Sequence, residues 1–598
     1  MSLTIHLLGR PRIDSPSGDT YQFRSRKSWA LLAFILLSGR PPTRSQLAAL
    51  LFAEADDPLR ALRWSLTEIR RGLGDQGSLE GDPVVLRLPT DCIVDVDVVI
   101  RGSWMDAVGL AGLGADLLDG IVIQGVAAFE TWLLSEQRHV AAASEAILHE
   151  AALGSMSRGD EQLAISYAVR AAVMNPLDEN HQALLIRLYR LTADDVAAEQ
   201  QFAACTELFL RELGLAPGPA VRAAMLETRH HGTEVTDPAS VAAIVEAGSA
   251  AVAAGAIEAG VRSLRTAVRL ADSANATGLR VSSRLVLAEA LVHSLRGFDE
   301  EGMAVLYEAA EIALANGDRG GVAQARAELG YVDFLRARYD RALMWLTDAL
   351  AFGDGSPSIV AKATTYLGSV ESDRANYVEA AELLERSIEL SRGVVDPRRE
   401  AFGLSMLGRV SLLRNDLDAA AQQLDDSIAL AEREHWLAIL PWPQALRGEV
   451  ELARNDPTAA DNLLRQSFAR ACQLGDPCWE AMAARGLAMV AEATGETTRA
   501  FELLADARTR CNRLADPYVW LDGYILDAQC SLGVRHGHPD TDVWVDTMQR
   551  LTSRTAMREL NVRSLLYGAA LGHEGDGAAA VLLAAQVENP SLHLLLSE

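Results

Sequence analysis

The pattern of apolar and polar positions divides the chain into a short mixed region followed by a long helical one. Residues 3–7 alternate between apolar and polar side chains and predict a strand, and turn-forming residues 17–19 lead into a second strand at residues 21–23. Apolar residues then occupy nearly every side of residues 26–38, which is typical of a helix packed between a sheet and other helices. The chain therefore begins as a compact α+β region.

Two further helices are predicted in this region. Thr43 and Gln46 have the spacing of a capping box and indicate a helix that begins after Thr43. The third helix covers residues 58–73, with Asp57 as a good N-cap and Gly74 as a stop. Its two faces differ in character: the apolar face holds Leu62, Leu66, Ile69 and Leu73, and the opposite face holds Arg60, Arg63, Thr67, Arg70 and Arg71.

A hairpin is predicted after the third helix. Two β-rich runs, residues 84–88 and residues 92–96, flank the turn-forming residues 89–91. Three helices followed by a hairpin are typical of a winged helix-turn-helix, in which the last helix enters the major groove and the hairpin reaches the flanking backbone. We therefore expect a winged-helix DNA-binding domain at residues 1–100.

From about residue 100 onward the pattern is entirely helical and repetitive. Gly159 and Ala193 open similar segments 34 residues apart, which is the period of the tetratricopeptide (TPR) repeat. A polar stretch at residues 229–240 predicts a linker, and after it the repeat lengthens to 38–41 residues. The predicted turns of these longer units lie at Phe298, Tyr339, Tyr377, Leu417, Pro457 and Thr497. We expect a mainly α chain in which the winged helix is followed by a TPR-like α-solenoid, with repeats and a C-terminal cap over residues 241–598.

Small residues recur inside the predicted helices with the same period. They are Gly330, Gly368, Gly408, Gly448 and Ala488. A glycine inside a helix is destabilising unless another element packs closely against it, so we expect the second helix of each pair to contact these positions. The tryptophans of this region are expected to be packing residues for the most part: Trp345, Trp436, Trp442 and Trp520.

Charge is distributed unevenly along the chain. Residues 1–74 contain 11 basic and 6 acidic residues, whereas the other 524 residues contain 44 basic and 75 acidic ones, which gives the whole chain a net charge of −26. Such an excess of negative charge repels nucleic acid, so any contact with DNA must be made by the N-terminal end. The acidic remainder serves solubility or suits a basic partner, and the sequence does not separate these two roles.

Several sequence motifs occur in a recognisable order over about residues 1–230. They are RSRKSWALLAFILLSGRPPTRSQLAALLF, LRWSLTEIRRGLG and VDVDV in the first hundred residues, followed by LLDG at 117–120, FETWL at 129–133, NPLDENHQAL at 175–184 and RELGLAPGP at 211–219. Together they resemble the antibiotic regulatory protein (SARP) family of bacterial transcriptional activators. The resemblance implies a winged helix of the response-regulator type, a bacterial transcriptional activation domain at residues 101–228, and activation through direct repeats in DNA.

The resemblance and the charge pattern together nominate residues for DNA contact. We expect base or near-base contacts from Arg63, Thr67 and Arg70, and phosphate contacts from Arg44, Arg60, Arg71 and the hairpin residue Arg87. The chain departs from the family at Thr67-Glu68, where many members have Ser-Arg. A carboxylate at position 68 repels phosphate but can accept a hydrogen bond from a cytosine amino group. The alternative for this helix is a solvated surface helix, with Trp64 covering an interdomain seam.

The sequence lacks the motifs that would indicate an enzyme, a cofactor site or a metal site. Lys27 and Lys362 are the only lysines and neither follows a glycine, which excludes a Walker A loop. A His-Gly-His tract at residues 536–538 lies in a polar turn and is interpreted as a loop and not as a metal site. We expect no catalytic site, no cofactor and no metal.

Cellular location is inferred from cysteines and apolar runs. The six cysteines are scattered without paired spacing, the first residues do not resemble a signal peptide, and the longest apolar run, residues 29–37, is too short to cross a bilayer. We therefore expect a cytoplasmic chain without a membrane partner.

Two functional interpretations follow from the sequence. The first is a sequence-specific regulator of transcription, an activator, that binds double-stranded DNA and uses its helical body to contact RNA polymerase, a second protomer or a regulatory partner, with a protein or peptide segment in the TPR groove. The alternative is a TPR scaffold or sensor whose N-terminal domain contacts protein. The two interpretations differ in the first 100 residues.

Overall fold

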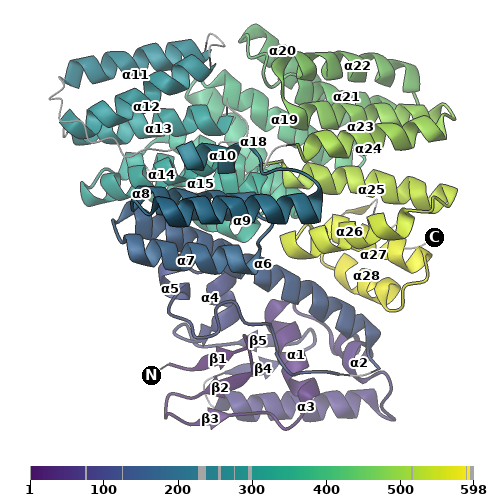
Figure 1. Cartoon of the computed structure of the whole chain (residues 1–598). Coiled ribbons are helices and arrows are strands. Elements are labelled where there is room, and N and C mark those ends of the chain that lie inside the picture. The colour runs from purple at the N-terminus through teal and green to yellow at the C-terminus, as the bar shows by residue number, and fades with distance from the viewer. Residues whose placement is uncertain are drawn as a thin grey trace. The chain divides into compact units, whose positions relative to one another are not determined.

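The structure is a computed structural model that describes residues 2–592 apart from 75–76, 124, 227–237, 254–256, 275, 294–298, 354, 514–515, 588 and 591. Most of the predicted linker and the predicted turn residue Phe298 lie outside the described residues. The chain forms two compact units: one contains Met1–Ile147 together with Gln529–Glu598, and the other contains Leu148–Ala528 (Figure 1).

A four-stranded sheet opens the first unit. Its strands lie in the order β3-β2-β1-β6 and comprise β1 (Thr4–His6), β2 (Arg12–Asp14), β3 (Thr20–Tyr21) and β6 (Ile93–Val94). β1 and β2 are antiparallel, with Ile5 and Ile13 opposite each other in register and both fully buried. The sequence analysis missed β2, and the strand that it expected at residues 21–23 is β3, which ends at Tyr21. β6 joins the other edge of β1 in the parallel direction.

The predicted hairpin at residues 84–88 and 92–96 is wrong in its pairing. Val85–Arg87 is indeed a strand (β5), but it pairs with a strand that the sequence analysis missed, β4 (Ser78–Glu80). Residues from Asp95 onward form a helix, because the buried Asp95 carboxylate accepts hydrogen bonds from the amides of Leu7, Leu8 and Val96 at 2.7–3.0 Å. Asp95 therefore ends β6 and attaches the following helix to the end of β1. The hairpin after the third helix is β4–β5.

Helices cover the sheet and complete the first unit. They are α1 (Arg26–Leu37), α2 (Arg44–Phe52), α3 (Pro58–Leu73), α4 (Asp95–Arg101), α5 (Trp104–Ala107), the first part of α6 (Ala127–Ser157), the last part of α25 (Val519–His536), α26 (Thr541–Thr555), α27 (Arg558–Ala570) and α28 (Asp576–Ala584). The capping box before α2 is present as predicted, with Thr43 Oγ1 accepting from the Gln46 amide and the Gln46 side chain accepting from the Thr43 amide. Trp132 of α6 packs against Phe34 of α1 with ring centroids 4.8 Å apart.

The segment between α5 and α6 corrects the expectation of an entirely helical chain after residue 100. Apart from residue 124, residues 108–126 form turns and irregular backbone, and Leu117 makes an isolated antiparallel bridge with Leu8. The amide of Leu118 donates to the carbonyl of Leu7 at 2.8 Å, so this segment continues the sheet region beyond β1. The LLDG motif at 117–120 thus contributes to the first unit through its backbone.

Residues between Arg554 and Ala585 contact residues 40–145 inside this unit. Arg40 Nη1 donates to the carbonyl oxygen of Ala585 at 3.4 Å, and Arg554 Nη2 pairs with Glu145 of α6 at 3.0 Å. Gly575 lies close to Ala127: a Cβ on residue 575 would be 2.9 Å from the backbone carbonyl carbon of Ala127. Residues 529–598 are therefore an integral part of the unit that contains the winged helix.

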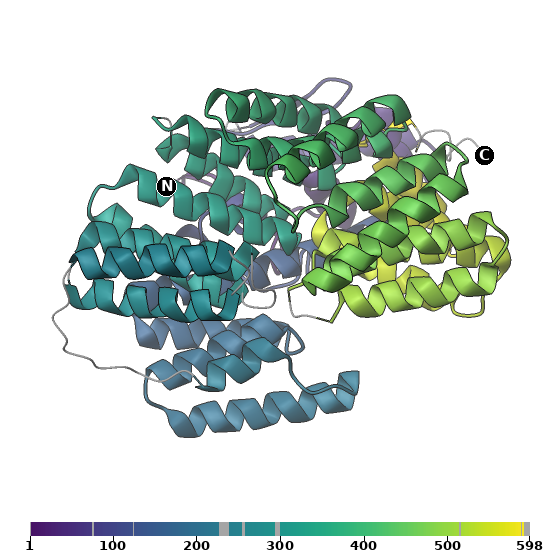
Figure 2. The same cartoon turned by 90° about the horizontal axis from the view of Figure 1, so that it is seen from above.

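The second unit consists of antiparallel helical hairpins (Figure 2). Its helices include α7 (Glu161–Met174), α8 (Glu179–Leu191), α9 (Asp195–Leu213), α10 (Pro219–Leu226), α11 (Pro238–Ala253), α12 (Ile257–Ala274), α13 (Thr277–His293), α14 (Asp299–Ala315), α15 (Arg319–Leu335), α16 (Tyr339–Phe352), α17 (Pro357–Asp373), α18 (Tyr377–Gly393), α19 (Pro397–Leu413), α20 (Leu417–Arg433), α21 (Pro441–Ala453), α22 (Pro457–Leu474), α23 (Pro477–Ala493) and α24 (Thr497–Cys511). The predicted turns at Tyr339, Tyr377, Leu417, Pro457 and Thr497 each begin the second helix of a pair. The mainly α, TPR-like fold class is confirmed.

The recurring glycines pack as their period predicts. A Cβ at Gly330 would be 2.6 Å from Cγ of Leu346, and each of the next three glycines is equally close to the leucine sixteen residues later. The four pairs are Gly330–Leu346, Gly368–Leu384, Gly408–Leu424 and Gly448–Leu464. Because a glycine leaves room for that leucine, these four positions fix how closely the two helices of each pair approach.

Buried ion pairs lie between helices α6 to α8 and the repeats that follow. Arg341 of α16 pairs with Glu150 of α6 through both carboxylate oxygens, and the two side chains are 3% and 0% exposed. His149 contacts Glu300 of α14 at 3.1 Å. Although burial opposes ionisation, His149 and Arg336 hold the pKa of Glu300 down to about 2. These contacts join helices far apart in the sequence within the second unit.

Candidate nucleic-acid interface

Helix α3 begins and ends where the sequence predicts. Asp57 caps the first turn by accepting a hydrogen bond from the Arg60 amide at 2.9 Å, and Pro58 takes the first helical position. Gly74 ends the helix with a φ of 58°, and its amide donates to the carbonyl of Arg70. Both ends are therefore fixed by local residues.

One face of α3 is buried against the rest of the winged helix. The predicted apolar stripe of Leu62, Leu66, Ile69 and Leu73 is no more than 1% exposed. Gly72 lies against the aromatic rings of Tyr21 and Phe23, and a Cβ there would be 2.6 Å from Phe23 Cε1. This packing fixes the rotation of the helix about its axis, and hence which residues face solvent.

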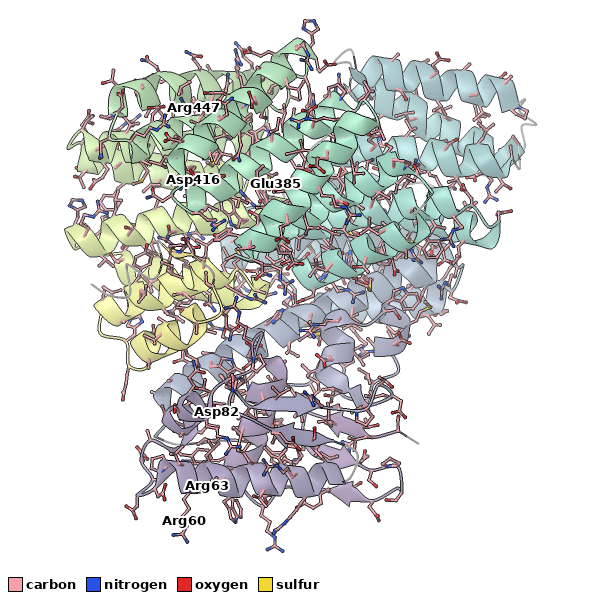
Figure 3. The ribbon with its side chains drawn as sticks, turned by 180° about the vertical axis from the view of Figure 1, so that it is seen from behind. Arg60, Arg63, Asp82, Glu385, Asp416 and Arg447 are labelled. Carbon is pink, nitrogen blue, oxygen red and sulfur yellow. The ribbon has the colours of Figure 1, made fainter. Side chains whose placement is uncertain are left out.

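The other face of α3 is open. It presents the side chains of Arg60, Arg63, Trp64, Thr67, Arg70 and Arg71. Figure 3 shows Arg60 and Arg63 projecting from α3 on the side away from the body of its domain. Within the described part of the chain, none of the four arginines lies within 4 Å of a carboxylate oxygen, and Arg63 Nε donates instead to the carbonyl of Leu59 one turn earlier. The Thr67 hydroxyl donates to the carbonyl of Arg63 at 2.8 Å.

Two of the predicted contact residues also hold the β4–β5 hairpin in place. Arg70 Nε donates to the carbonyl of Leu79 in β4 at 2.8 Å. Arg44, at the start of α2, donates from Nε to the carbonyl of Gly81 at 3.0 Å and from its amide to Asp82 Oδ1 at 2.8 Å. Arg87 is exposed on β5 of the same hairpin. The seven nominated residues therefore lie on three neighbouring elements, and the structure gives Arg44 and Arg70 a positioning role that the sequence did not indicate.

Glu68 has a structural role that sequence analysis missed. Its carboxylate is 6% exposed and accepts hydrogen bonds from the Arg24 amide at 2.8 Å and from the Ser28 hydroxyl at 2.5 Å. Ser25 supplies no side-chain cap to α1, and these two hydrogen bonds hold the Glu68 carboxylate next to the positively polarised beginning of that helix, which it stabilises. The carboxylate faces the interior, so neither repulsion of phosphate nor recognition of cytosine applies to it. Thr67 and Glu68 are neighbours in the sequence, but Thr67 is exposed and Glu68 is buried.

Trp345, Trp442 and Trp520 are 1–8% exposed, consistent with packing roles. No group of three His, Cys, Asp or Glu side chains in the described residues is placed to hold a metal ion. In that same part of the chain, no helix combines the length and apolar character that crossing a membrane requires.

The geometry defines a class of protein: a winged helix with an open cationic third helix, joined to TPR-like helical hairpins. Residues 98–229 match a family of known proteins described as the bacterial transcriptional activator domain. The chain therefore contains a bacterial transcriptional activator domain, and the resemblance to SARP-type activators is confirmed. No curated protein sequence matches this chain.

Several solved structures are similar to this chain at low sequence identity. The Rap protein complexed with competence and sporulation factor is 11% identical, with 60% of this chain and 99% of that chain covered and a TM-score of 0.42. The Rap conjugation gene regulator of plasmid pLS20, in complex with the Phr* peptide, is 9% identical, with 59% and 97% covered and a TM-score of 0.37. The Cut9–Hcn1 hetero-tetramer of the APC/C is 12% identical, with 76% and 96% covered and a TM-score of 0.33.

Proposed function

We propose that this protein is a sequence-specific, DNA-binding regulator of transcription that acts as an activator. The observation that carries the proposal is the open face of α3, whose arginines are solvent-exposed and have no carboxylate partner among the described residues. A cationic face that has no carboxylate partner among the described residues, on a chain with a net charge of −26, indicates an external polyanion. The activator domain at residues 98–229 supports DNA as that polyanion.

The nominated residues divide into two kinds of contact. Arg63, Thr67 and Arg70 are proposed to contact bases or lie next to them, because they occupy the solvent side of the helix that enters the major groove in winged-helix proteins. Arg44, Arg60, Arg71 and Arg87 are proposed to contact phosphates and set the position of the domain on the duplex. Arg70 can position the β4–β5 hairpin and contact a base at the same time. Its Nε donates to the carbonyl of Leu79, and its two terminal nitrogens are proposed to contact the base.

The helical body is proposed to contact proteins. RNA polymerase, a second protomer, or a protein or peptide segment in the TPR groove are the proposed partners, because a stack of helical pairs presents an extended surface without catalytic geometry. The expected domain boundaries at 1–100, 101–228, 229–240 and 241–598 and the cytoplasmic location belong to the same proposal. Neither catalysis nor a cofactor enters it.

Selection of binding sites from random DNA duplexes with the full chain tests the proposal. We expect an enriched motif for the wild-type protein. Arg63→Ala and Arg70→Ala are expected to abolish specific binding, whereas Arg465→Ala, which removes an exposed arginine already paired with Asp461 at 2.6 Å, is expected to leave binding unchanged. A selection that returned no motif, with correctly folded protein, would favour the alternative of a TPR scaffold or sensor.

A further inference from the structure

Trp64 is an aromatic side chain that the fold does not bury. It is 55% exposed on the open face of α3, whereas Trp29 of α1 and Trp132 of α6 in the same unit are 3% and 2% exposed. Those two tryptophans contact other aromatic rings, at 4.0 Å from Phe23 and 4.8 Å from Phe34. The stability of α3 does not depend on Trp64, because the apolar stripe that anchors the helix lies on its other side.

The surroundings of Trp64 indicate what it meets. Arg60 lies one turn before it and Thr67 one turn after it on the same helix face, so an apolar surface is set within a cationic one. The Thr67 hydroxyl donates a hydrogen bond to the Arg63 carbonyl. The Thr67 methyl group is then the apolar part of that side chain on this face. A partner that fits must be anionic and must carry an apolar group opposite Trp64.

Double-stranded DNA has one such group on its base edges. In the major groove the edges of the bases present hydrogen-bond donors and acceptors, and the only apolar group among them is the C5-methyl of thymine. A large apolar side chain gains affinity there by removing that methyl from water. Charge complementarity with the neighbouring arginines selects DNA over an apolar protein surface.

We propose that Trp64 determines specificity by contacting a thymine methyl, with the Thr67 methyl extending the same apolar strip. This inference rests on the proposed DNA-binding function and deepens it, because it assigns an A·T pair to the part of the site that faces the first half of α3. The arginines on either side supply attraction to phosphate and to guanine, and Trp64 supplies discrimination that charge alone does not give.

Replacing thymine by uracil tests the contact. Each thymine of the selected duplex is replaced in turn by deoxyuridine, which keeps base pairing and removes only the methyl. For the wild-type full-length chain we expect about four-fold weaker binding at one or two positions, the change that corresponds to roughly 0.8 kcal/mol for one buried methyl-sized group. Trp64→Ala is expected to bind the thymine and uracil duplexes at those positions equally well.

Controls separate this inference from the proposed function. Arg60→Ala, a neighbour on the same face, is expected to weaken binding while keeping the preference for thymine over uracil. If wild-type protein binds its site but no position responds to uracil, or if Trp64→Ala keeps the response, the inference is wrong and DNA binding stands. If wild-type protein selects no duplex at all, the proposed function itself fails. Thermal unfolding of Trp64→Ala should match wild type, since the side chain is exposed.

Discussion

The arginines of α3 and the arginines between the repeat helices place the same guanidinium group in opposite settings. Arg409 and its partner Asp373 are both 0% exposed, and Arg341 with Glu150 is almost as deeply buried. Arg60, Arg63 and Arg71 are exposed and, in the described part of the chain, lie within ion-pair distance of no carboxylate. The difference separates arginines that assemble the protein from arginines that are free to bind something else.

Desolvation explains why the two settings differ. A buried guanidinium must have carboxylate and hydrogen-bond partners, because an unpaired buried charge is strongly destabilising. Arg409 therefore has Asp373, Ser372 and Tyr518 as hydrogen-bond partners and lies over the ring of Trp520 at 4.3 Å. An exposed arginine is solvated and needs no partner within its own chain. Net charge alone does not distinguish the structural arginines from the exposed ones. Their burial and their carboxylate partners do.

The largest expected effect comes from breaking a buried pair. Arg341→Ala leaves the buried Glu150 carboxyl without its guanidinium partner, so we expect the free energy of unfolding of the second unit to fall by about 3–5 kcal/mol. Chemical denaturation followed by circular dichroism measures the change. Arg465→Ala, whose pair with Asp461 is exposed, should change stability by less than about 1 kcal/mol. Equal losses in both variants would contradict the distinction between the two settings.

A smaller loss is expected from Glu68, the one buried acid of α3. Glu68→Ala removes the acceptor for the Arg24 amide and the Ser28 hydroxyl and should destabilise the first unit by about 1–3 kcal/mol. Glu80→Ala, on the exposed side of β4, is the matched control and should be near neutral. The sequence preference of the surviving Glu68→Ala protein should equal that of wild type. A changed preference would show that Glu68 takes part in the proposed DNA interface.

The buried polar contacts also predict a dependence on pH through His181. Burial lowers the pKa of His181 to about 4, and the charged or titratable groups around it are Asp178, His149, Arg338 and Glu300. Because the unfolded chain takes up this proton near pH 6.5 and the folded chain does not, stability falls as pH decreases from about 6.5 to about 4. Between pH 7.5 and pH 5.5 the His181 contribution should cost about 1.4 kcal/mol. Denaturation at both values, compared with His181→Gln, measures it; an identical pH response in the variant would refute it.

The smallest effect belongs to the exposed face. Arg71→Ala is expected to weaken binding to all duplexes by a similar factor and to lower the slope of log affinity against log salt by about 1, since one phosphate contact is lost. Stability should not change. Titrations of specific and random duplexes at several salt concentrations test this. Selective loss for the specific duplex would move Arg71 from the phosphate contacts to the base contacts.

Local signals in the sequence predicted the parts of the fold that local chemistry determines. The ends of α3 follow from Asp57 and Gly74, and the glycine period of the repeats follows from the leucine that each glycine faces. The pairing of the predicted hairpin was wrong because β4 is only three residues long, with Leu79 as its one apolar residue, and is too short to show a pattern in the sequence. The role of Asp95 depends on amides almost ninety residues earlier in the chain, which no local window contains.

The candidate interface shows the same division. The cationic face of α3 could be predicted from helical spacing, which is a local property. The burial of Glu68 could not, because it depends on where the beginning of α1 packs. The attachment of Arg44 and Arg70 to the hairpin requires the correct pairing of β4 with β5. Long-range contacts therefore decided the points at which the interpretation of the interface failed.

The presence of residues 529–598 in the unit that contains α1 to α3 has a consequence for biosynthesis. When the ribosome has produced the winged helix, the segment that contributes Ala585 and Arg554 is still several hundred codons away. The nascent amino-terminal region must wait, with that part of its surface uncovered, until translation has passed every repeat. The winged helix is thus synthesised before the repeats and yet is among the last regions to reach its final packing, and premature termination within the repeats would release chains whose amino-terminal unit is incomplete.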